Sequence, residues 1–455
     1  MNATHPVYDL GIDIGTSKVA AVLWDAAAGR LVAAHSMEHR AAVAGLPAGR
    51  AEQDVARIWA AVRTAMARFS AADRAAVRRI GVTGQMHGVV VVDQQLAPVT
   101  NLVTWQDQRC LEDGFLAEFR DRTGDASVHT GFGGATLAWL AGHDAIPAGA
   151  AAAATIHDLL VAQLCGLDHP ATDTTDAASW GFYDLGKSRW CASAWRKAGV
   201  SAKLLPRILP CGTCAGRTGV VAATEFGVPA NVPVMVALGD NQASIWATMA
   251  GHDPETTLAL TLGTGGQLSA VMPAAFKVRP PRGCPFEFRP FPGGRVAAVA
   301  ATLSGGGAIA WMVDTLAQWC GELGVNAPDR DELFEKLNRL GCEATGDGIS
   351  VTPTFYGERH DPARRGAVTG IGSSNLTLGN LFRALAGGVV QNLFGMLPPE
   401  CMRGRRLVVG SGNAVRRLPV LQECIREVTG LPLELTAGRE EAATGAAMLA
   451  GEMRE

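Results

Sequence analysis

The residues with the clearest chemistry lie in two glycine-containing turns, one in each half of the chain. Each turn follows an apolar run with the pattern of a buried strand, and apolar residues resume after it, as in a hairpin. Glycine lets the backbone approach a ligand closely, and successive backbone N–H groups at such a turn attract an anion. The pattern predicts two phosphate-binding turns, although either turn alone would equally suit an ordinary hairpin. The turn residues are Gly15, Thr16 and Ser17 in the first half and Gly263, Thr264 and Gly265 in the second.

A carboxylate, Asp13, stands just before the first turn. Alone it would repel a phosphate group. A Mg²⁺ ion between the two removes the repulsion, because Mg²⁺ takes one or two carboxylates together with phosphate oxygens. We therefore expect Asp13 to help hold Mg²⁺.

Two loops of the first half carry polar side chains beside apolar strands. Gln85 and His87 stand in a glycine-flanked break between two strands, where side chains can project into a cleft, although a turn with polar tips is the alternative. Trp105, Asp107 and Arg109 share one short loop. That mixture suits a polyhydroxylated ligand, because the indole covers C–H groups while Asp and Arg hold hydroxyls. A surface salt bridge beside a packed tryptophan fits the same residues.

Asp240 follows a buried strand predicted at 234–238 and begins a helix predicted to end at Met249. A carboxylate there would cap the helix, and this is also where α/β folds place reacting groups. The second half has two more glycine turns that follow strands, at 304–307 and 410–414. A nucleotide can lie against such a turn because no side chain blocks it.

Composition narrows the class of protein. The chain has 455 residues, 48% of them apolar and 18% charged, which suits a globular protein of two or three domains. A net charge of −3 gives no basic field for nucleic acid or an anionic membrane. The start of the sequence has no secretory pattern, and the longest low-complexity run, 148–154, is too short to span a bilayer. The ten cysteines have no framework spacing, and the pair Cys211 and Cys214 lacks a second pair for a zinc site. We expect a cytoplasmic protein without nucleic-acid or membrane partners.

The strand and helix patterns repeat in the two halves as a βββαβα plan. This repeat predicts two similar domains, 1–250 and 251–455, with the boundary near 250–255, where polar residues and Pro254 separate the halves. Strands are predicted at 8–14, 19–24, 31–35, 79–83 and 296–303, and helices from 55 (with Asp54 as N-cap) and at 156–164, 308–319 and 440–450, with a capping-rich structural turn at 172–177.

Together and in order, these motifs resemble the FGGY carbohydrate kinases, members of the sugar kinase, heat-shock protein and actin superfamily, over essentially the whole chain. No single motif is decisive, but the ordered set is specific. The resemblance implies an α/β fold of two duplicated actin-like (ribonuclease H-like) ATPase domains that face a central cleft. The matching segments are residues 13–16, 84–88, 105–109, 239–243, 263–266 and 410–414.

The resemblance also implies residue roles. The N-terminal domain would bind a ketose and the C-terminal domain ATP with Mg²⁺, and Asp240 would be the general base for the terminal sugar hydroxyl. Arg109 would support its loop by pairing with a carboxylate. The sugar-binding residues would be Gln85, Met86, His87, Trp105, Asp107, Asp240 and Asn241. The ATP-binding residues would be Gly15, Thr16, Ser17, Gly263, Thr264, Gly265, Gly306, Gly307, Gly410, Ser411, Gly412 and Asn413, with Asp13 at the metal.

Within the family the chain is most similar to the sedoheptulokinases, with the xylulokinases next. Segments 105–107, 131–136, 178–181, 357–360 and 389–393 favour the former, whereas 263–266 has the general family form and 361–366 is xylulokinase-like. Two other classes stay open. An actin-like ATPase that binds a partner protein would not need the two polar loops, and the intact Asp13 and Asp240 argue against a silent sugar-binding regulator. A homodimer is a possible assembly.

Overall fold

The computed structural model describes residues 7–125, 128–278, 284–346, 348–358, 361, 363–436, 438 and 440–453. The chain divides into two compact units. Unit 1 comprises Met1–Ala247, Pro290–Gly294 and Gly438–Glu455, and unit 2 comprises Thr248–Arg289 and Arg295–Ala437. The chain first leaves unit 1 close to the boundary that the sequence predicts. Its last residues, however, rejoin unit 1, which a single boundary at 250–255 does not anticipate.

A mixed sheet forms the centre of unit 1, and its first three strands, predicted at 8–14, 19–24 and 31–35, form an antiparallel meander. Strand β1 pairs with β2 on one side and, in parallel, with β5 on the other, so the order is β13-β14-β5-β1-β2-β3 with β15 also paired to β5. The strands are β1 (Tyr8–Ile14), β2 (Lys18–Asp25), β3 (Arg30–Glu38), β5 (Val77–Gly84), β13 (Cys214–Arg217), β14 (Pro233–Met235) and β15 (Leu238–Gly239). The single strand predicted at 234–238 is therefore two short ones.

Helices and short strand pairs surround this sheet. Asp54 caps α1 as predicted, since its carboxylate accepts from the backbone N–H groups of Ala56 and Arg57. The helices are α1 (Val55–Ala67), α2 (Ala71–Ala75), α3 (Phe115–Thr123), α4 (Gly133–Gly142), α5 (Ile156–Cys165), α6 (Thr174–Ser179), α7 (Ala192–Lys197), α8 (Val220–Phe226), α9 (Asp240–Thr248) and α16 (Glu441–Gly451). The short pairs are β4 (Glu52–Gln53) with β7 (Leu102–Val103), β6 (Val90–Val92) with β8 (Ala152–Ala154), β9 (Ala171–Asp173) with β12 (Arg207–Leu209), and β10 (Tyr183–Asp184) with β11 (Arg189–Trp190).

The prediction of a turn at 172–177 is wrong. These residues form the end of β9 and most of α6, a helix with Asp173 as its N-cap. The cap-forming residue types were correctly noticed, but a six-residue helix is too short to show a 3.6-residue apolar period.

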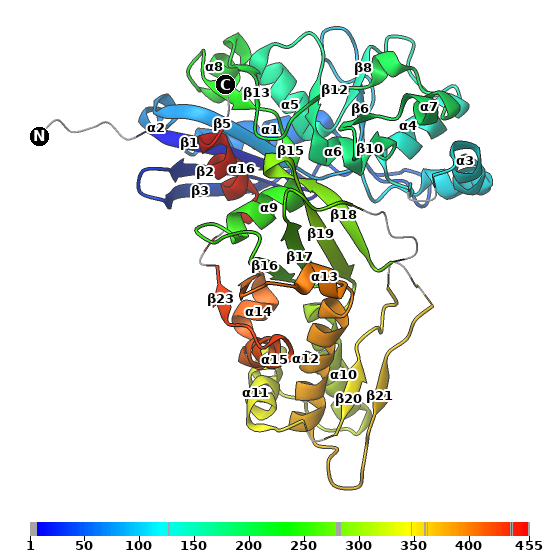
Figure 1. Ribbon diagram of the computed structural model, residues 1–455, viewed down its shortest axis with the longest axis vertical. Helices are drawn as coiled ribbons and strands as arrows, with labels where there is room; N and C mark the ends of the chain where they lie inside the picture. The colour runs from blue at the N-terminus through cyan, green and yellow to red at the C-terminus, as the bar shows by residue number, and fades with distance from the viewer. Residues whose placement is uncertain are drawn as a thin grey trace, which may run out of the picture. The chain divides into compact units, whose positions relative to one another are not determined.

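The C-terminal helix α16 packs very closely on the sheet of unit 1, as its small residues predict. It contacts β1, β2 and β5, and Figure 1 shows it in red against the blue strands. A Cβ added at Gly11 or Gly81 would lie 2.0 Å from a carbonyl oxygen of α16, and one at Gly445 would lie 1.9 Å from the carbonyl oxygen of Ala243. Glycine at these positions is what lets the helix approach β1, β5 and α9.

Unit 2 repeats the plan with a six-stranded sheet in the order β18-β19-β17-β16-β22-β23. Strand β16 pairs with β17 in a hairpin and, in parallel, with β22. The strands are β16 (Thr257–Leu262), β17 (Gly266–Met272), β18 (Phe286–Phe291), β19 (Arg295–Thr302), β22 (Leu407–Ser411) and β23 (Leu433–Leu435), with the separate pair β20 (Ser350–Thr352) and β21 (Ala367–Thr369). The helices are α10 (Gly306–Glu322), α11 (Arg330–Glu343), α12 (Leu378–Phe394), α13 (Pro399–Met402), α14 (Asn413–Arg417) and α15 (Pro419–Thr429).

No helix within the described ranges has the length and apolar character needed to cross a membrane. Apart from Cys284, the cysteines are free thiols, and all nine of these belong to the described residues.

Candidate active site

The first phosphate turn connects β1 to β2 and is held mainly by side chains. Its own hydrogen bond runs from the Gly15 N–H to the Lys18 carbonyl, at 3.0 Å. Three side chains then reach the turn: His39 Nε2 lies 3.2 Å from the Gly15 carbonyl, Gln53 Nε2 donates to the Thr16 carbonyl at 2.7 Å, and Trp105 Nε1 donates to Thr16 Oγ1 at 3.0 Å. The turn is thereby fixed to the loop that carries Trp105.

Asp13 lies within electrostatic reach of Asp240. Burial raises the pKa of Asp13 well above its ordinary value, and the negative charge of Asp240 raises it further. Asp13 Oδ1 is buried and finds no hydrogen-bond partner among the described residues. A buried carboxylate with an unused oxygen and a second carboxylate nearby is compensated by a cation, so the residues present fit a divalent ion.

Asp240 is the first residue of α9 and directly follows β15, which pairs with β5. The adjoining backbone is anchored from α6, since the Gly239 N–H donates to Thr175 Oγ1 at 2.9 Å and Thr175 Oγ1 donates to Asp173 Oδ1 at 2.6 Å. This chain of hydrogen bonds holds the backbone immediately before Asp240 in place. Asn241, the next residue, is half-buried.

The loop at 84–88 lies against the start of α9. A Cβ at Gly239 would stand 2.7 Å from Met86 Cε, so Met86 occupies the space next to the residue that precedes Asp240. Gln85 is 2% exposed, its backbone N–H donates to the Ile14 carbonyl, and its Nε2 donates to Gln53 Oε1 at 2.9 Å. The structure thus brings Gln85 and Met86 to the carboxyl ends of β1 and β15.

His87 has a positive φ of 73°, uncommon for a residue with a side chain. Its backbone N–H donates to Ser179 Oγ, and its Nδ1 lies 2.7 Å from the Ser179 carbonyl. Because a carbonyl only accepts, Nδ1 carries the proton. The imidazole also stacks on Phe132, with ring centroids 4.5 Å apart. The hydrogen bond at Nδ1 and the stacking contact with Phe132 together hold this ring in one orientation.

The Trp105 loop combines an exposed aromatic with a buried ion pair. The side chain of Trp105 is 41% exposed, whereas Asp107 and Arg109 are buried. Arg109 Nε donates to Asp107 Oδ1 at 2.8 Å, its Nη2 donates to Glu52, and the Ala51 N–H donates to Asp107 Oδ2. Arg109 supports the loop, as the resemblance implies. Both oxygens of Asp107 already accept hydrogen bonds, so a sugar contact there stays a prediction.

Unit 1 also holds a buried group of His157, Asp158 and Asp176, with one nitrogen or oxygen of each within 4.8 Å of the others. His157 Nε2 is 2.7 Å from Asp176 Oδ2. Burial lowers the pKa of His157 and raises the pKa values of Asp158 and Asp176. Each shift favours the neutral form of its group.

The glycine turns of unit 2 are packed backbone against backbone. The Gly306 N–H donates to the Gly263 carbonyl at 2.7 Å, and the Gly307 N–H donates to the Thr264 carbonyl at 2.8 Å. A Cβ at Gly412, where φ is 92°, would lie 2.4 Å from the Leu262 carbonyl oxygen. The predicted ATP-binding turns at 263–265, 306–307 and 410–413 therefore meet in one place. The amides of Gly306 and Gly307 are used inside the protein, so these glycines contribute the close approach of the turns.

Glu358 stabilises the backbone next to these glycine turns. No role for it was predicted from the sequence. It is fully buried and accepts from Thr302 Oγ1 at 2.6 Å and from Asn392 Nδ2 at 2.8 Å. Thr302 ends β19 just before the turn that opens α10. Glu358 and Asn392 belong to two of the segments that favour the sedoheptulokinase branch, whereas residues 359, 360 and 362 lie outside the described residues.

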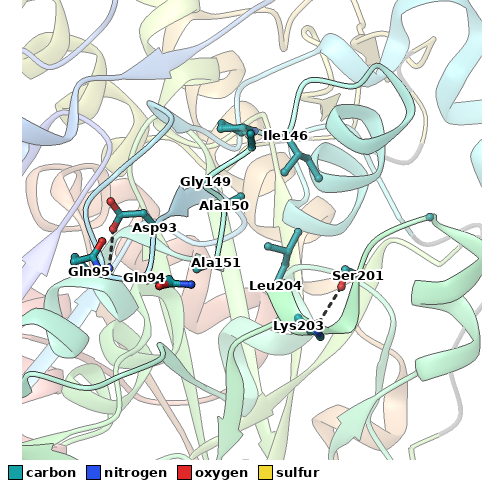
Figure 2. Close-up of a pocket in the computed structure, with 13 residues that line it drawn as sticks. Asp93, Gln94, Gln95, Ile146, Gly149, Ala150, Ala151, Ser201, Lys203 and Leu204 are labelled. Carbon is teal, nitrogen blue, oxygen red and sulfur yellow. Dashed lines mark hydrogen bonds between the residues drawn. The ribbon is translucent and has the colours of Figure 1, made fainter.

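A surface pocket of about 840 Å³ lies elsewhere on unit 1 (Figure 2). Its lining comes from residues 93–95 and 146–151 and from Gly199, Ser201, Lys203 and Leu204. None of the predicted site residues lines it, and its loops are closed by local contacts such as the Gln95 N–H to Asp93 Oδ1. We do not assign it to the reaction.

Comparison with known proteins agrees with this geometry. Residues 8–247 match the N-terminal domain of the FGGY family of carbohydrate kinases, and residues 258–453 match the C-terminal domain. The chain belongs to the FGGY family of carbohydrate kinases. This FGGY kinase is 37% identical to the sedoheptulokinase of Homo sapiens over 98% of both chains, and 28% identical to the xylulose kinase of Streptomyces coelicolor over 98% of this chain and 88% of the relative.

Solved structures place the FGGY kinase in the same fold. The xylulose kinase of Rhodospirillum rubrum superposes with a TM-score of 0.81 at 25% identity, covering 98% of this chain and 89% of the relative. The predicted fold class, two actin-like domains of mixed α/β structure, is confirmed. The protein is a sugar kinase, and kinases of this family use ATP.

Proposed function

We propose that this FGGY kinase transfers the γ-phosphoryl group of ATP to the terminal hydroxyl of a ketose, with sedoheptulose as its preferred substrate and sedoheptulose 7-phosphate as the product. The segments typical of sedoheptulokinases carry this choice. Phe132 stacks on His87, Ser179 binds His87, and a Cβ at Gly131 would lie 2.1 Å from the Trp105 carbonyl oxygen. These segments thus contact two predicted sugar-binding residues, the side chain of His87 and the backbone of Trp105. The 37% identity to a sedoheptulokinase supports the same sugar.

In this proposal the sugar lies on unit 1, in contact with the residues predicted from the sequence. The indole of Trp105 covers C–H groups of the sugar, and Gln85, His87 and Asn241 bind its hydroxyls. Asp240 takes the proton of the terminal hydroxyl as the oxygen attacks the γ-phosphorus in line. The anchoring of Gly239 by Thr175 supports this role, since a base must be held within hydrogen-bond reach of its proton.

Asp13 is proposed to hold Mg²⁺, directly or through water. When bound, the ion neutralises charge on the phosphate oxygens. Thr16 and Thr264, with neighbouring backbone N–H groups, steady the transferring phosphoryl group. The adenosine part of ATP lies in unit 2 along the glycine turns at 306–307 and 410–413, which the close backbone packing brings together.

The remaining proposals concern the location of the protein in the cell and its oligomeric state. A cytoplasmic location suits the nine free thiols named above and a reaction that consumes ATP. The homodimer named above is distinguished from a monomer by light scattering after size exclusion.

The deciding experiment is coupled ADP release with ATP and Mg²⁺ against sedoheptulose, xylulose, ribulose, fructose and glycerol. A preference for sedoheptulose supports the proposal. A preference for xylulose supports the second candidate, which the xylulose kinase relatives and the segment at 361–366 favour. Steady ATP hydrolysis that no sugar stimulates would contradict both and favour an actin-like ATPase.

A further inference from the structure

Gln53 connects two parts of the predicted site, although it belongs to no motif that the sequence displays. It is the last residue of β4, immediately before the N-cap of α1, and is 5% exposed. Its amide makes two hydrogen bonds in opposite senses. Nε2 donates to the Thr16 carbonyl at 2.7 Å, and Oε1 accepts from Gln85 Nε2 at 2.9 Å.

The second of these bonds decides how the amide of Gln85 is turned. Since Gln53 Oε1 can only accept, the NH₂ group of Gln85 must face it. Gln85 Oε1 then points away from Gln53, and this oxygen is buried with no hydrogen-bond partner among the described residues. A buried acceptor without a donor is costly, and a sugar hydroxyl is a donor that would satisfy it.

The first bond fixes the turn that is proposed to steady the phosphoryl group. Thr16 is held on its carbonyl by Gln53 and on its hydroxyl by Trp105. The strand that carries Gln53 is in turn fixed to the Trp105 loop, because Gln53 pairs with Leu102 in the β4–β7 ladder and the Thr104 N–H donates to the Ala51 carbonyl. The backbone of Gln53 is therefore held in place, and its side chain can position Thr16 and Gln85.

We infer that Gln53 is a positioning residue for the kinase reaction: it turns the Gln85 carbonyl toward a sugar hydroxyl and holds Thr16 in place for the phosphoryl group. The inference rests on the proposed function, in which Gln85 binds the sugar. Gln53 itself touches neither substrate. Its two effects act at different stages, because the Gln85 contact governs sugar binding and the Thr16 contact governs turnover.

A double-mutant cycle separates these effects. The variants are Gln53→Met, Gln85→Met and the double variant, because methionine keeps the length of glutamine and removes its hydrogen bonds. Gln163→Met is the matched control, since Gln163 is a partly buried glutamine of α5 whose Nε2 donates to the Leu96 carbonyl. The sugar KM and kcat are measured by coupled ADP release, and thermal unfolding shows whether each variant folds.

For Gln53→Met we expect the sugar KM to rise about 10-fold and kcat to fall about 10-fold, the scale of one lost hydrogen bond each. Gln85→Met should raise KM about 100-fold. In the double variant the KM should equal that of Gln85→Met, since Gln53 acts on sugar binding only through Gln85, while the fall in kcat persists.

Multiplied KM effects in the double variant would overturn the inference, as would Gln53→Met constants that match those of Gln163→Met. A merely structural role would lower the yield or the unfolding temperature and leave the constants of the folded fraction unchanged. Wild-type protein that phosphorylates none of the sugars would overturn the proposed function and this inference together. Normal wild-type turnover with an unaffected Gln53→Met would overturn the inference alone.

Discussion

The phosphate turn of unit 1 and its counterpart in unit 2 occupy equivalent places in equivalent hairpins, yet different kinds of contact hold them. Gly15 and Thr16 are held by the side chains of His39, Gln53 and Trp105. Gly263 and Thr264 are held by backbone N–H groups of the next turn. The repeated fold therefore provides a glycine turn twice, and the surrounding side chains decide what each turn can do.

The difference is sharpest at the residue two positions before each turn glycine. Unit 1 has Asp13 there, and unit 2 has Thr261, whose hydroxyl lies 2.9 Å from Ser411 Oγ. Their neighbours in the adjoining parallel strand are Thr83 and Ser411. Unit 1 thus carries carboxylates at the strand ends, as chemistry with a cation and a proton requires, whereas unit 2 carries hydroxyl groups there beside closely packed glycine turns.

The largest expected effect tests whether the general base of the reaction is a carboxylate of unit 1. Asp240→Asn should lower kcat by about 10³-fold, because a positioned general base contributes roughly 10²- to 10⁴-fold. Coupled ADP release with the preferred ketose measures it, and thermal unfolding should stay within a few degrees of wild type. Asp184→Asn, at a partly exposed pair with Lys187, is the control and should keep kcat within about twofold. Turnover within tenfold of wild type would remove Asp240 from this role.

The second test substitutes the equivalent residues of the two turns, one at a time. Asp13→Asn should lower kcat/KM by about 10- to 100-fold and raise the Mg²⁺ concentration needed for half-maximal rate. Thr261→Val, at the matching place in unit 2, should change the rate by less than about fivefold, since it loses one neutral hydrogen bond. Equal Mg²⁺ dependence in the two variants would contradict the comparison.

The third test concerns the close packing of the glycine turns in unit 2. Gly412→Ala should raise the KM for ATP and destabilise the protein by about 2–5 kcal/mol, because it adds a clash with the Leu262 carbonyl to the cost of a backbone conformation (φ 92°, ψ 158°) that only glycine adopts readily. Gly404 has a φ of 78°, and a Cβ added there would meet no atom within 4 Å, so Gly404→Ala carries the backbone cost alone, about 1 kcal/mol. Urea unfolding and ATP titration of the two variants check the difference, and identical behaviour would remove the steric argument.

The last test concerns a pH dependence that belongs to unit 1. Burial, with the charge of Asp176, raises the pKa of Asp173 from 3.8 to about 7. Between these values the folded protein keeps a proton that the unfolded chain has released, so the free energy of unfolding falls as pH rises, by at most about 1.4 kcal/mol per pH unit. Asn at this position keeps an oxygen for the N–H of Thr175 and removes the titration.

For Asp173→Asn we therefore expect the stability of the variant relative to wild type to increase from pH 4 to 7 and then level off. Unfolding free energies across that range measure it. A constant difference between the two proteins would show that Asp173 does not retain its proton.

Several features were predictable because they are local in the sequence. The meander of β1 to β3, the N-cap at Asp54, the end of α5 at Gly166 in a left-handed conformation and the small-residue face of α16 all follow from patterns within a few residues. The helix at 174–179 and the break between β14 and β15 were not predicted, since short elements carry too little periodicity and their form depends on what they pack against.

The sequence by itself determined the residue types and their order: glycine turns after buried strands, Asp13 before one of them, and Asp240 at a strand end. These are enough to indicate phosphoryl transfer, because the chemistry depends on which groups are present. Only the tertiary structure decided the partners. Gln53 with Thr16 and Gln85, Thr175 with Gly239, and Glu358 with Asn392 join residues distant in the chain. A hydrogen bond needs two atoms at one distance and angle, and the fold alone sets both.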